Sequence, residues 1–214
     1  MLTVYAFGNV PAPVIGVTRD LSVLWAAEEA AVPYRIKPLD HARGDLRSPE
    51  YLRVQPFGQI PAIEDGELTL FESAAIVLYI AEKAKRLLPA EPTARALAWQ
   101  WAFAATTTVE PSMADLFLLE TFYAGQPWAK ERRPMLVGLA EKRLSSLEPK
   151  LACRSYLLGD DFTAPDILMC AALRLLRHTD LLDTAPSVAA YKARCEARPA
   201  WKKIYSAYEQ RLAA

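Results

Sequence analysis

The residues best suited to chemistry in this chain lie between Phe57 and Ser73. Glu72 and Ser73 come at the expected junction of a strand and a helix, where free backbone amides and the positive end of the helix dipole favour a carboxylate. The Glu72 carboxylate can accept a hydrogen bond from an ammonium group of the same ligand. The pair is therefore complementary to the zwitterionic head of an amino acid, and the segment predicts a site for a small peptide.

Ile60-Pro61 stands at the start of a predicted strand, where proline is tolerated only at a first or edge position. A cis bond is expected in this tight loop. The Ile60 N–H and C=O would then pair with an extended peptide in the way that an added strand does. This predicts affinity for a peptide backbone without any charged side chain.

Thr18 is the candidate for activating a thiol. Residues 1–86 contain no cysteine, so a reactive sulfur has to arrive with the ligand. A charge-assisted hydrogen bond from a hydroxyl contributes about 1.5 to 3 kcal/mol, enough to lower a thiol pKa by about one to two units. The alternative interpretation makes Thr18 only the N-cap of the first helix. Because the loop at 8–17 is long, Asn9 and Ser22 are further candidates.

The elements that must position these residues change character near residue 88. Strands are expected at 2–6, 34–37, 60–63 and 67–70, and helices at 18–31, 48–54 and 73–85. This βαβαββα order predicts a thioredoxin-like α/β domain over residues 1–86. Pro89 and Pro92 mark a linker, and residues 93–214 predict an all-helical domain in which Thr163 and Asp166 form a capping box.

The composition excludes several classes of function. With 25 basic and 25 acidic residues the formal net charge is zero, which argues against a nucleic-acid partner. The longest apolar run is far below the roughly 18 to 20 residues of a membrane span, and the start lacks a secretory signal, so a cytoplasmic location is expected. Three widely spaced cysteines indicate neither a disulfide framework nor a zinc site, and His41 and His178 are not assigned to a metal.

The run Pro56 to Ser73, PFGQIPAIEDGELTLFES, resembles the signature of the soluble, cytosolic-type glutathione S-transferases, in a bacterial-like form. Thr163-Ala164-Pro165-Asp166 is similar to the capping box of that family, and Arg198-Pro199 is similar to a motif ahead of its last helix. The resemblance therefore spans nearly the whole chain. It implies the glutathione transferase fold and a homodimer.

The resemblance also implies an activity. Glutathione would be the co-substrate, with no metal, and its activated thiol would attack a small hydrophobic electrophile or a peroxide in detoxification. Thr18 would activate the thiol. Competing hypotheses are a noncatalytic binding or regulatory protein on the same fold, favoured if Thr18 is only a cap, and a glutathione-dependent reductase, disfavoured because the first domain lacks cysteine.

Contacts for glutathione follow from the same resemblance. Ile60, through a cis Ile60-Pro61 bond, would pair with the cysteinyl backbone, and Glu72 and Ser73 would hold the γ-glutamyl head. Gln59 and Arg47 are candidates for the glycyl end. Arg47 has a second interpretation as a solvated residue on a short helix.

Overall fold

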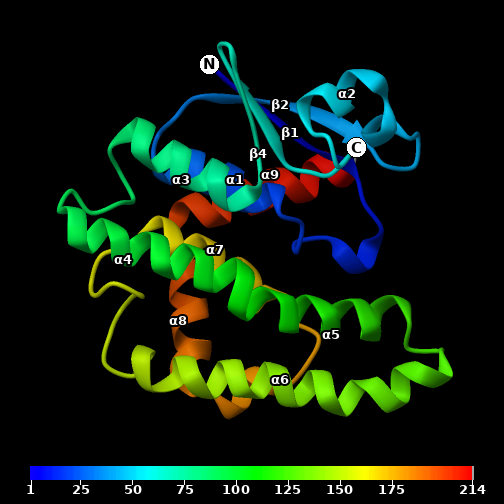
Figure 1. Cartoon of the computed structure of the whole chain (residues 1–214), viewed down its shortest axis with the longest axis vertical. Coiled ribbons are helices and arrows are strands. Elements are labelled where there is room, and N and C mark those ends of the chain that lie inside the picture. The colour runs from blue at the N-terminus through cyan, green and yellow to red at the C-terminus, as the bar shows by residue number, and fades with distance from the viewer. Residues whose placement is uncertain (214) are drawn as a thin grey trace. The chain divides into compact units, whose positions relative to one another are not determined.

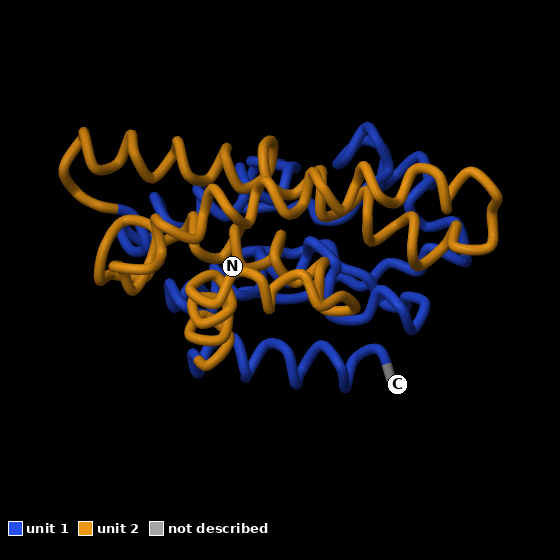
Figure 2. The backbone as a smooth tube through the Cα atoms, turned by 90° about the horizontal axis from the view of Figure 1, so that it is seen from below, with its two compact units in different colours: residues 1–88, 198–214 blue, residues 89–197 orange. Residues whose placement is uncertain are grey.

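The computed structural model describes residues 1–213 and divides into two compact units (Figure 2). The first unit comprises residues 1–88 together with the C-terminal segment from Arg198, and the second comprises residues 89–197. The sequence predicts domains over residues 1–86 and 93–214. In the structure the segment from Arg198 packs with the first unit rather than with the second.

The first unit contains a mixed sheet of four strands together with helices. Figure 1 labels three of these strands, β1, β2 and β4. The sheet order is β2-β1-β3-β4, with β1 parallel to β2 and antiparallel to β3, and β3 antiparallel to β4. This confirms the predicted thioredoxin-like arrangement. The strands are β1 Leu2–Asn9, β2 Tyr34–Asp40, β3 Ala62–Asp65 and β4 Leu68–Phe71; the helices are α1 Asp20–Glu29, α2 Pro49–Val54, α3 Ser73–Ala84 and α9 Pro199–Ala213, with 3-10 turns at Ala12–Val14 and Asp45–Arg47.

Helix α1 is the centre of this unit. Every residue from Asp20 to Ala27 is buried, so the helix has no solvated face in its first two turns. The physical reason is that β1, α3 and α9 all pack against α1. Hydrophobic burial on several sides of one helix explains why its sequence, rich in leucine, valine, alanine and tryptophan, shows no clear polar stripe.

Three boundaries near the candidate site differ from the prediction. Strand β3 begins at Ala62 rather than at residue 60, so Ile60 and Pro61 precede it. Helix α1 begins at Asp20 rather than at residue 18, with Arg19 as the N-cap and no side-chain capping bond. Strand β1 runs on to Asn9, because it stays paired with β2 up to Asp40, and a 3-10 turn occupies Ala12–Val14. The loop before Thr18 is therefore shorter and more ordered than the sequence indicates.

The second unit is helical. Its capping box is confirmed: the Asp166 carboxylate accepts hydrogen bonds from the Thr163 amide at 2.8 Å and the Thr163 hydroxyl at 2.7 Å. Asp166 also accepts from the Leu157 amide and the Tyr191 hydroxyl, both at 2.9 Å. The helices are α4 Pro92–Phe103, α5 Glu110–Phe122, α6 Pro127–Leu151, α7 Ala164–Arg174 and α8 Pro186–Glu196, with a π-helical segment at Ala104–Val109 and a 3-10 turn at Leu181–Thr184.

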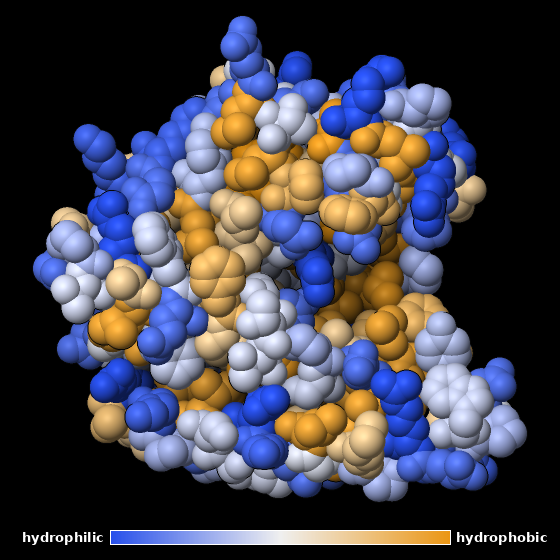
Figure 3. All heavy atoms as spheres, in the orientation of Figure 1, coloured by the Kyte–Doolittle hydropathy of each residue, from blue (hydrophilic) through white to orange (hydrophobic). Residues whose placement is uncertain are grey.

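The surface is mixed in character. On the face drawn in Figure 3, hydrophilic and hydrophobic side chains are interspersed. Among residues 1–213, none of the helices combines the length and the apolar character that crossing a bilayer requires.

Replacing Asp166 with alanine is expected to lower the free energy of unfolding by about 3 kcal/mol or more, because buried donors from Leu157, Thr163 and Tyr191 would lose their acceptor. Urea unfolding measures this loss. The matched control is Asp115→Ala, which removes an exposed ion pair with Arg132 and is expected to cost no more than about 1 kcal/mol. Equal losses in the two variants would contradict the role given to Asp166.

Candidate functional site

A pocket in the first unit gathers most of the residues singled out from the sequence. Three segments meet there: the start of α1, the connection from α2 to β3, and the junction of β4 with α3. The pocket is lined by Arg19, Gln55, Gln59, Ile60, Pro61, Glu72 and Ser73. Five of these were predicted as site residues, whereas the predicted residues Thr18 and Arg47 do not line the pocket.

The segment Gln59-Ile60-Pro61 forms one wall. The Ile60-Pro61 bond is cis, as predicted, and Ile60 lies immediately before β3. The Tyr51 hydroxyl on α2 donates to the Gln59 carbonyl at 2.6 Å. Burial raises the pKa of the Tyr51 phenol, with the neighbouring Tyr5 adding to the rise, so the phenol keeps its proton and remains a donor. Tyr51 therefore fixes the backbone that carries Ile60.

Gln55 is a lining residue that the sequence reasoning missed. It ends α2 and is 2% exposed, and its side-chain carbonyl accepts from the Phe57 amide at 2.6 Å. The sequence signal was its place directly before Pro56, at the start of the motif already singled out. Gln55 thus shapes the turn that leads into Gln59 while lining the pocket.

Gly58 allows that turn to pass close to its neighbour. Its φ is +62°, and a Cβ at this position would lie 2.6 Å from the Leu46 carbonyl oxygen. Only glycine tolerates both the left-handed conformation and this approach. Arg47 follows Leu46 in the chain and is exposed on the 3-10 turn, so the close approach holds the backbone of Arg47 near the Gly58-Gln59 segment.

The opposite wall is the start of α3. Ser73 is the first residue of the helix, so its first turn carries backbone amides without an intrahelical acceptor. Glu72 is exposed and adopts a φ of +72°, which costs a non-glycine residue about 1 to 3 kcal/mol. Strain of this kind persists where the surrounding structure holds it, and it is typical of ligand sites. The position of Glu72 beside a helix start agrees with a site for a zwitterion.

Thr18 lies directly before Arg19, and its hydroxyl makes a contact that the sequence did not predict. Its Oγ1 is 2.8 Å from the Tyr208 hydroxyl on α9. Thr18 does not cap α1. The further candidates do not line the pocket either: Ser22 is buried inside α1 at 3% exposure, and Asn9 is exposed at the end of β1. Arg19 is therefore the residue of this segment that reaches the pocket.

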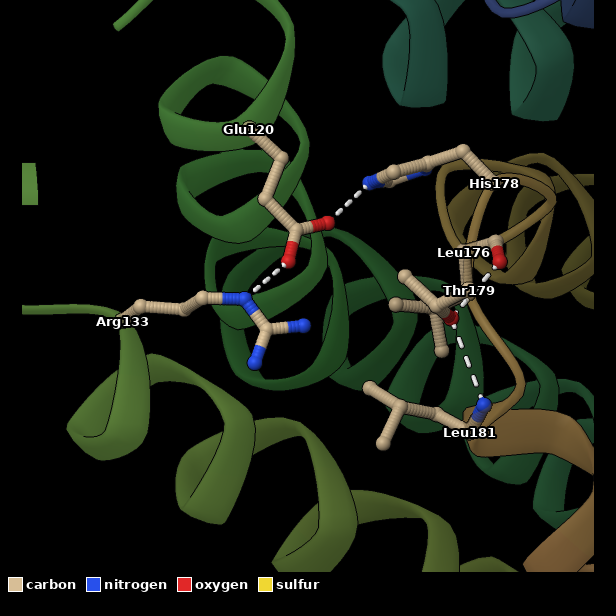
Figure 4. Close-up of polar contacts among 6 residues, drawn as sticks. All are labelled: Glu120, Arg133, Leu176, His178, Thr179 and Leu181. Atoms are coloured by element: carbon tan, nitrogen blue, oxygen red, sulfur yellow. Dashed lines mark hydrogen bonds and ion pairs between the residues drawn. The ribbon is translucent and has the colours of Figure 1, made fainter. Parts of the chain in front are cut away.

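A separate polar cluster in the second unit is shown in Figure 4. Glu120 on α5 contacts His178 Nε2 at 2.6 Å and accepts from Arg133 Nε on α6 at 2.6 Å. The His178 ring also packs edge-on against Phe117, with centroids 5.5 Å apart. These contacts join helices α5 and α6 to the segment that follows α7, and we interpret the cluster as structural. Within residues 1–213, no three histidine, cysteine, aspartate or glutamate side chains gather closely enough to hold a metal ion.

The fold and the pocket together define a class: a thioredoxin-like domain with a cis-proline loop that lines a pocket, followed by a helical domain. The family model for the glutathione S-transferase N-terminal domain matches residues 14–82, and that for the C-terminal domain matches residues 129–199. The chain belongs to the glutathione S-transferase family. The family, fold and type of activity predicted from the sequence are thereby confirmed.

Individual relatives agree over nearly the whole chain. A probable glutathione S-transferase of Oryza sativa subsp. japonica is 31% identical, with 89% of this chain and 91% of that protein covered. The crystal structure of poplar glutathione transferase F1 matches with a TM-score of 0.86 and 28% identity, covering 98% of both chains. A family member from Pseudomonas fluorescens with two glutathione bound matches with a TM-score of 0.85 and 27% identity, covering 95% of this chain and 92% of that chain.

Gly58→Ala is expected to destabilise the protein by more than the roughly 1 to 2 kcal/mol that a left-handed conformation costs, because its Cβ would also meet the Leu46 carbonyl. Gly66→Ala is the matched control, since Gly66 has a φ of +63° but nothing lies within 4 Å of a Cβ there. Urea unfolding of both variants separates the two effects. The assigned contact with Leu46 is wrong if both variants lose the same stability.

Proposed function

We propose that this chain binds glutathione in the pocket of its first unit and ionises the thiol for attack on a small hydrophobic electrophile or a peroxide. The observation that carries the proposal is the meeting of Ile60, Glu72 and Ser73 around one pocket. Membership of the glutathione S-transferase family supports the same ligand, as does the glutathione in the related Pseudomonas fluorescens structure.

The γ-glutamyl head is assigned to the start of α3. Its carboxylate is placed against the amides and hydroxyl of Ser73, where the helix dipole adds about 0.3 to 1 kcal/mol. Its ammonium is placed against the Glu72 carboxylate. A charge-assisted hydrogen bond of this kind contributes about 1.5 to 3 kcal/mol. Because these contacts act on charges that do not change during the reaction, they serve affinity rather than catalysis.

The remaining backbone of glutathione is assigned to the opposite wall. The Ile60 N–H and C=O are placed to pair with the cysteinyl residue as an added strand would. Gln59 and Arg47 are the proposed contacts for the glycyl carboxylate, and the Gln55 side chain lies in the same wall as Gln59. Arg47 is exposed, so its side chain is free to extend along the surface toward a bound ligand.

Activation of the thiol is assigned to the segment before α1. A free cysteine thiol has a pKa near 8.5, so only a few per cent is ionised at neutral pH, and lowering the pKa by about two units requires about 2.7 kcal/mol. We assign a hydrogen bond to the sulfur to the Thr18 hydroxyl. Arg19, the next residue, lines the pocket, and its positive charge favours the thiolate.

Two variants with opposite expected effects test the assignment. Thr18→Ala is expected to raise the pKa of bound glutathione, measured by the ultraviolet absorbance of the thiolate against pH, with little change in affinity. Glu72→Gln is expected to weaken binding by about 10- to 100-fold in calorimetry, with the thiol pKa unchanged. Each variant serves as the control for the other, because one acts on the sulfur and the other on the glutamyl head.

If the protein is instead a noncatalytic binding protein on the same fold, the measurement of the thiol pKa is expected to give a different result. Wild-type protein would then bind glutathione without lowering its thiol pKa, and Thr18→Ala would change nothing. Absence of glutathione binding to the wild type would refute both versions of the proposal.

A homodimer and a cytoplasmic location complete the proposal. The Phe57 side chain is 63% exposed, and its ring packs edge-on against Phe71 with centroids 5.9 Å apart. An exposed aromatic ring on a fixed support is a typical anchor for a partner, here a second copy of the chain. Light scattering is expected to give twice the 23.8 kDa chain mass for the wild type and a shift toward monomer for Phe57→Ser. A monomeric wild type would exclude the dimer.

A further inference from the structure

The last helix, α9, is fixed on α1 at both of its ends. At the N-terminal end of α9, Arg198 donates to both Glu29 carboxylate oxygens, at 2.6 and 2.8 Å. At the other end, Arg211 Nη2 donates to Asp20 Oδ2 at 3.2 Å. Because Asp20 begins α1 and Glu29 ends it, the two helices run antiparallel. The C-terminal part of α9 therefore lies at the start of α1, beside Thr18 and Arg19.

Tyr208 is the α9 residue that touches Thr18. It is 1% exposed, and its hydroxyl lies 2.8 Å from Thr18 Oγ1. Burial raises the pKa of the Tyr208 phenol, while hydrogen bonding with the Thr18 side chain and with the Gly16 backbone opposes the rise. The phenol thus keeps its proton at neutral pH. The distance to Thr18 fits either hydroxyl as the donor, and a protonated phenol can donate to the Thr18 oxygen.

Asp20 competes for the proton of the Thr18 hydroxyl. Its carboxyl group is fully buried, and Oδ2 accepts from the Phe7 amide and from Arg211, each at 3.2 Å. Burial raises the pKa of Asp20, and the Thr18 hydroxyl and the Arg211 charge oppose that rise. An uncompensated carboxylate here would attract the hydroxyl proton and repel a nearby thiolate. Arg211 reduces both effects, and its guanidinium also lies over the Tyr208 ring, 5.2 Å from the centroid.

We propose that Tyr208 and Arg211 are positioning residues for thiol activation, acting through Thr18. Tyr208 donates to Thr18 Oγ1, so the Thr18 proton points away from Tyr208 and toward the sulfur of bound glutathione. Arg211 offsets part of the Asp20 charge, which weakens the attraction of the carboxylate for the same proton. The inference rests on the proposed function, in which the Thr18 hydroxyl donates to the sulfur. The charged groups around this hydroxyl are Arg19, Asp20 and Arg211.

Tyr208→Phe tests the inference, because it keeps the buried ring and removes only the hydroxyl. We expect a higher pKa for bound glutathione and about a tenfold lower kcat with a standard aromatic electrophile, with the KM for glutathione unchanged. Tyr205→Phe, the same substitution one turn earlier on α9, is the matched control and is expected to leave both quantities unchanged. Near-ultraviolet circular dichroism checks that Tyr208→Phe is folded.

A double-mutant cycle separates positioning from a general loosening of α9. In a Thr18→Ala background, Tyr208→Phe is expected to have no further effect on the thiol pKa or on kcat, since the hydroxyl through which Tyr208 acts is gone. Equal effects in both backgrounds would overturn the inference. The inference would also be overturned if the wild type lowers the pKa of bound glutathione below that of free glutathione and Tyr208→Phe lowers it equally. That result would leave the proposed function standing. Failure of the wild type to lower the thiol pKa would overturn both.

Discussion

The arrangement of the first unit depends on the hydrogen bonds that the buried Asp20 carboxylate accepts. This carboxylate accepts from the Phe7 amide on β1 and from Arg211 on α9, and Asp20 begins α1. Removing an ion from water costs several kcal/mol, so such a group persists only when partners are held around it. Asp20 consequently joins a strand, a helix start and the C-terminal helix at one point. The segment carrying Thr18 and Arg19 is held between these attachments.

The pocket itself is assembled from short-range constraints. The Tyr51 hydroxyl holds the Gln59 carbonyl, and Gly58 lets its backbone pass the Leu46 carbonyl at a distance that no side chain would permit. Glu72 is held in a left-handed conformation at the start of α3. Two rigid walls therefore face one another before any ligand arrives. Preorganisation of this kind lowers the entropic cost of binding a flexible tripeptide.

In the proposed function, capture and activation are separate tasks. Capture is assigned to the cis-proline loop and the helix start, both within residues 55–73. Activation is assigned to Thr18, whose hydroxyl contacts Tyr208, 190 positions away in the chain. Through this contact α9 is joined to the segment before α1. A change in α9 is expected to alter reactivity while leaving affinity intact.

Features that depend on neighbours along the chain could be predicted from the sequence. These are the thioredoxin-like order of elements, the Thr163 and Asp166 capping box, the cis Ile60-Pro61 bond and the Glu72-Ser73 helix start, because their hydrogen bonds and backbone preferences span only a few residues. Other features depend on tertiary packing. The burial of Ser22, the recruitment of Gln55 and the pairing of Thr18 with Tyr208 follow from packing between distant segments, for which no local pattern of residues exists.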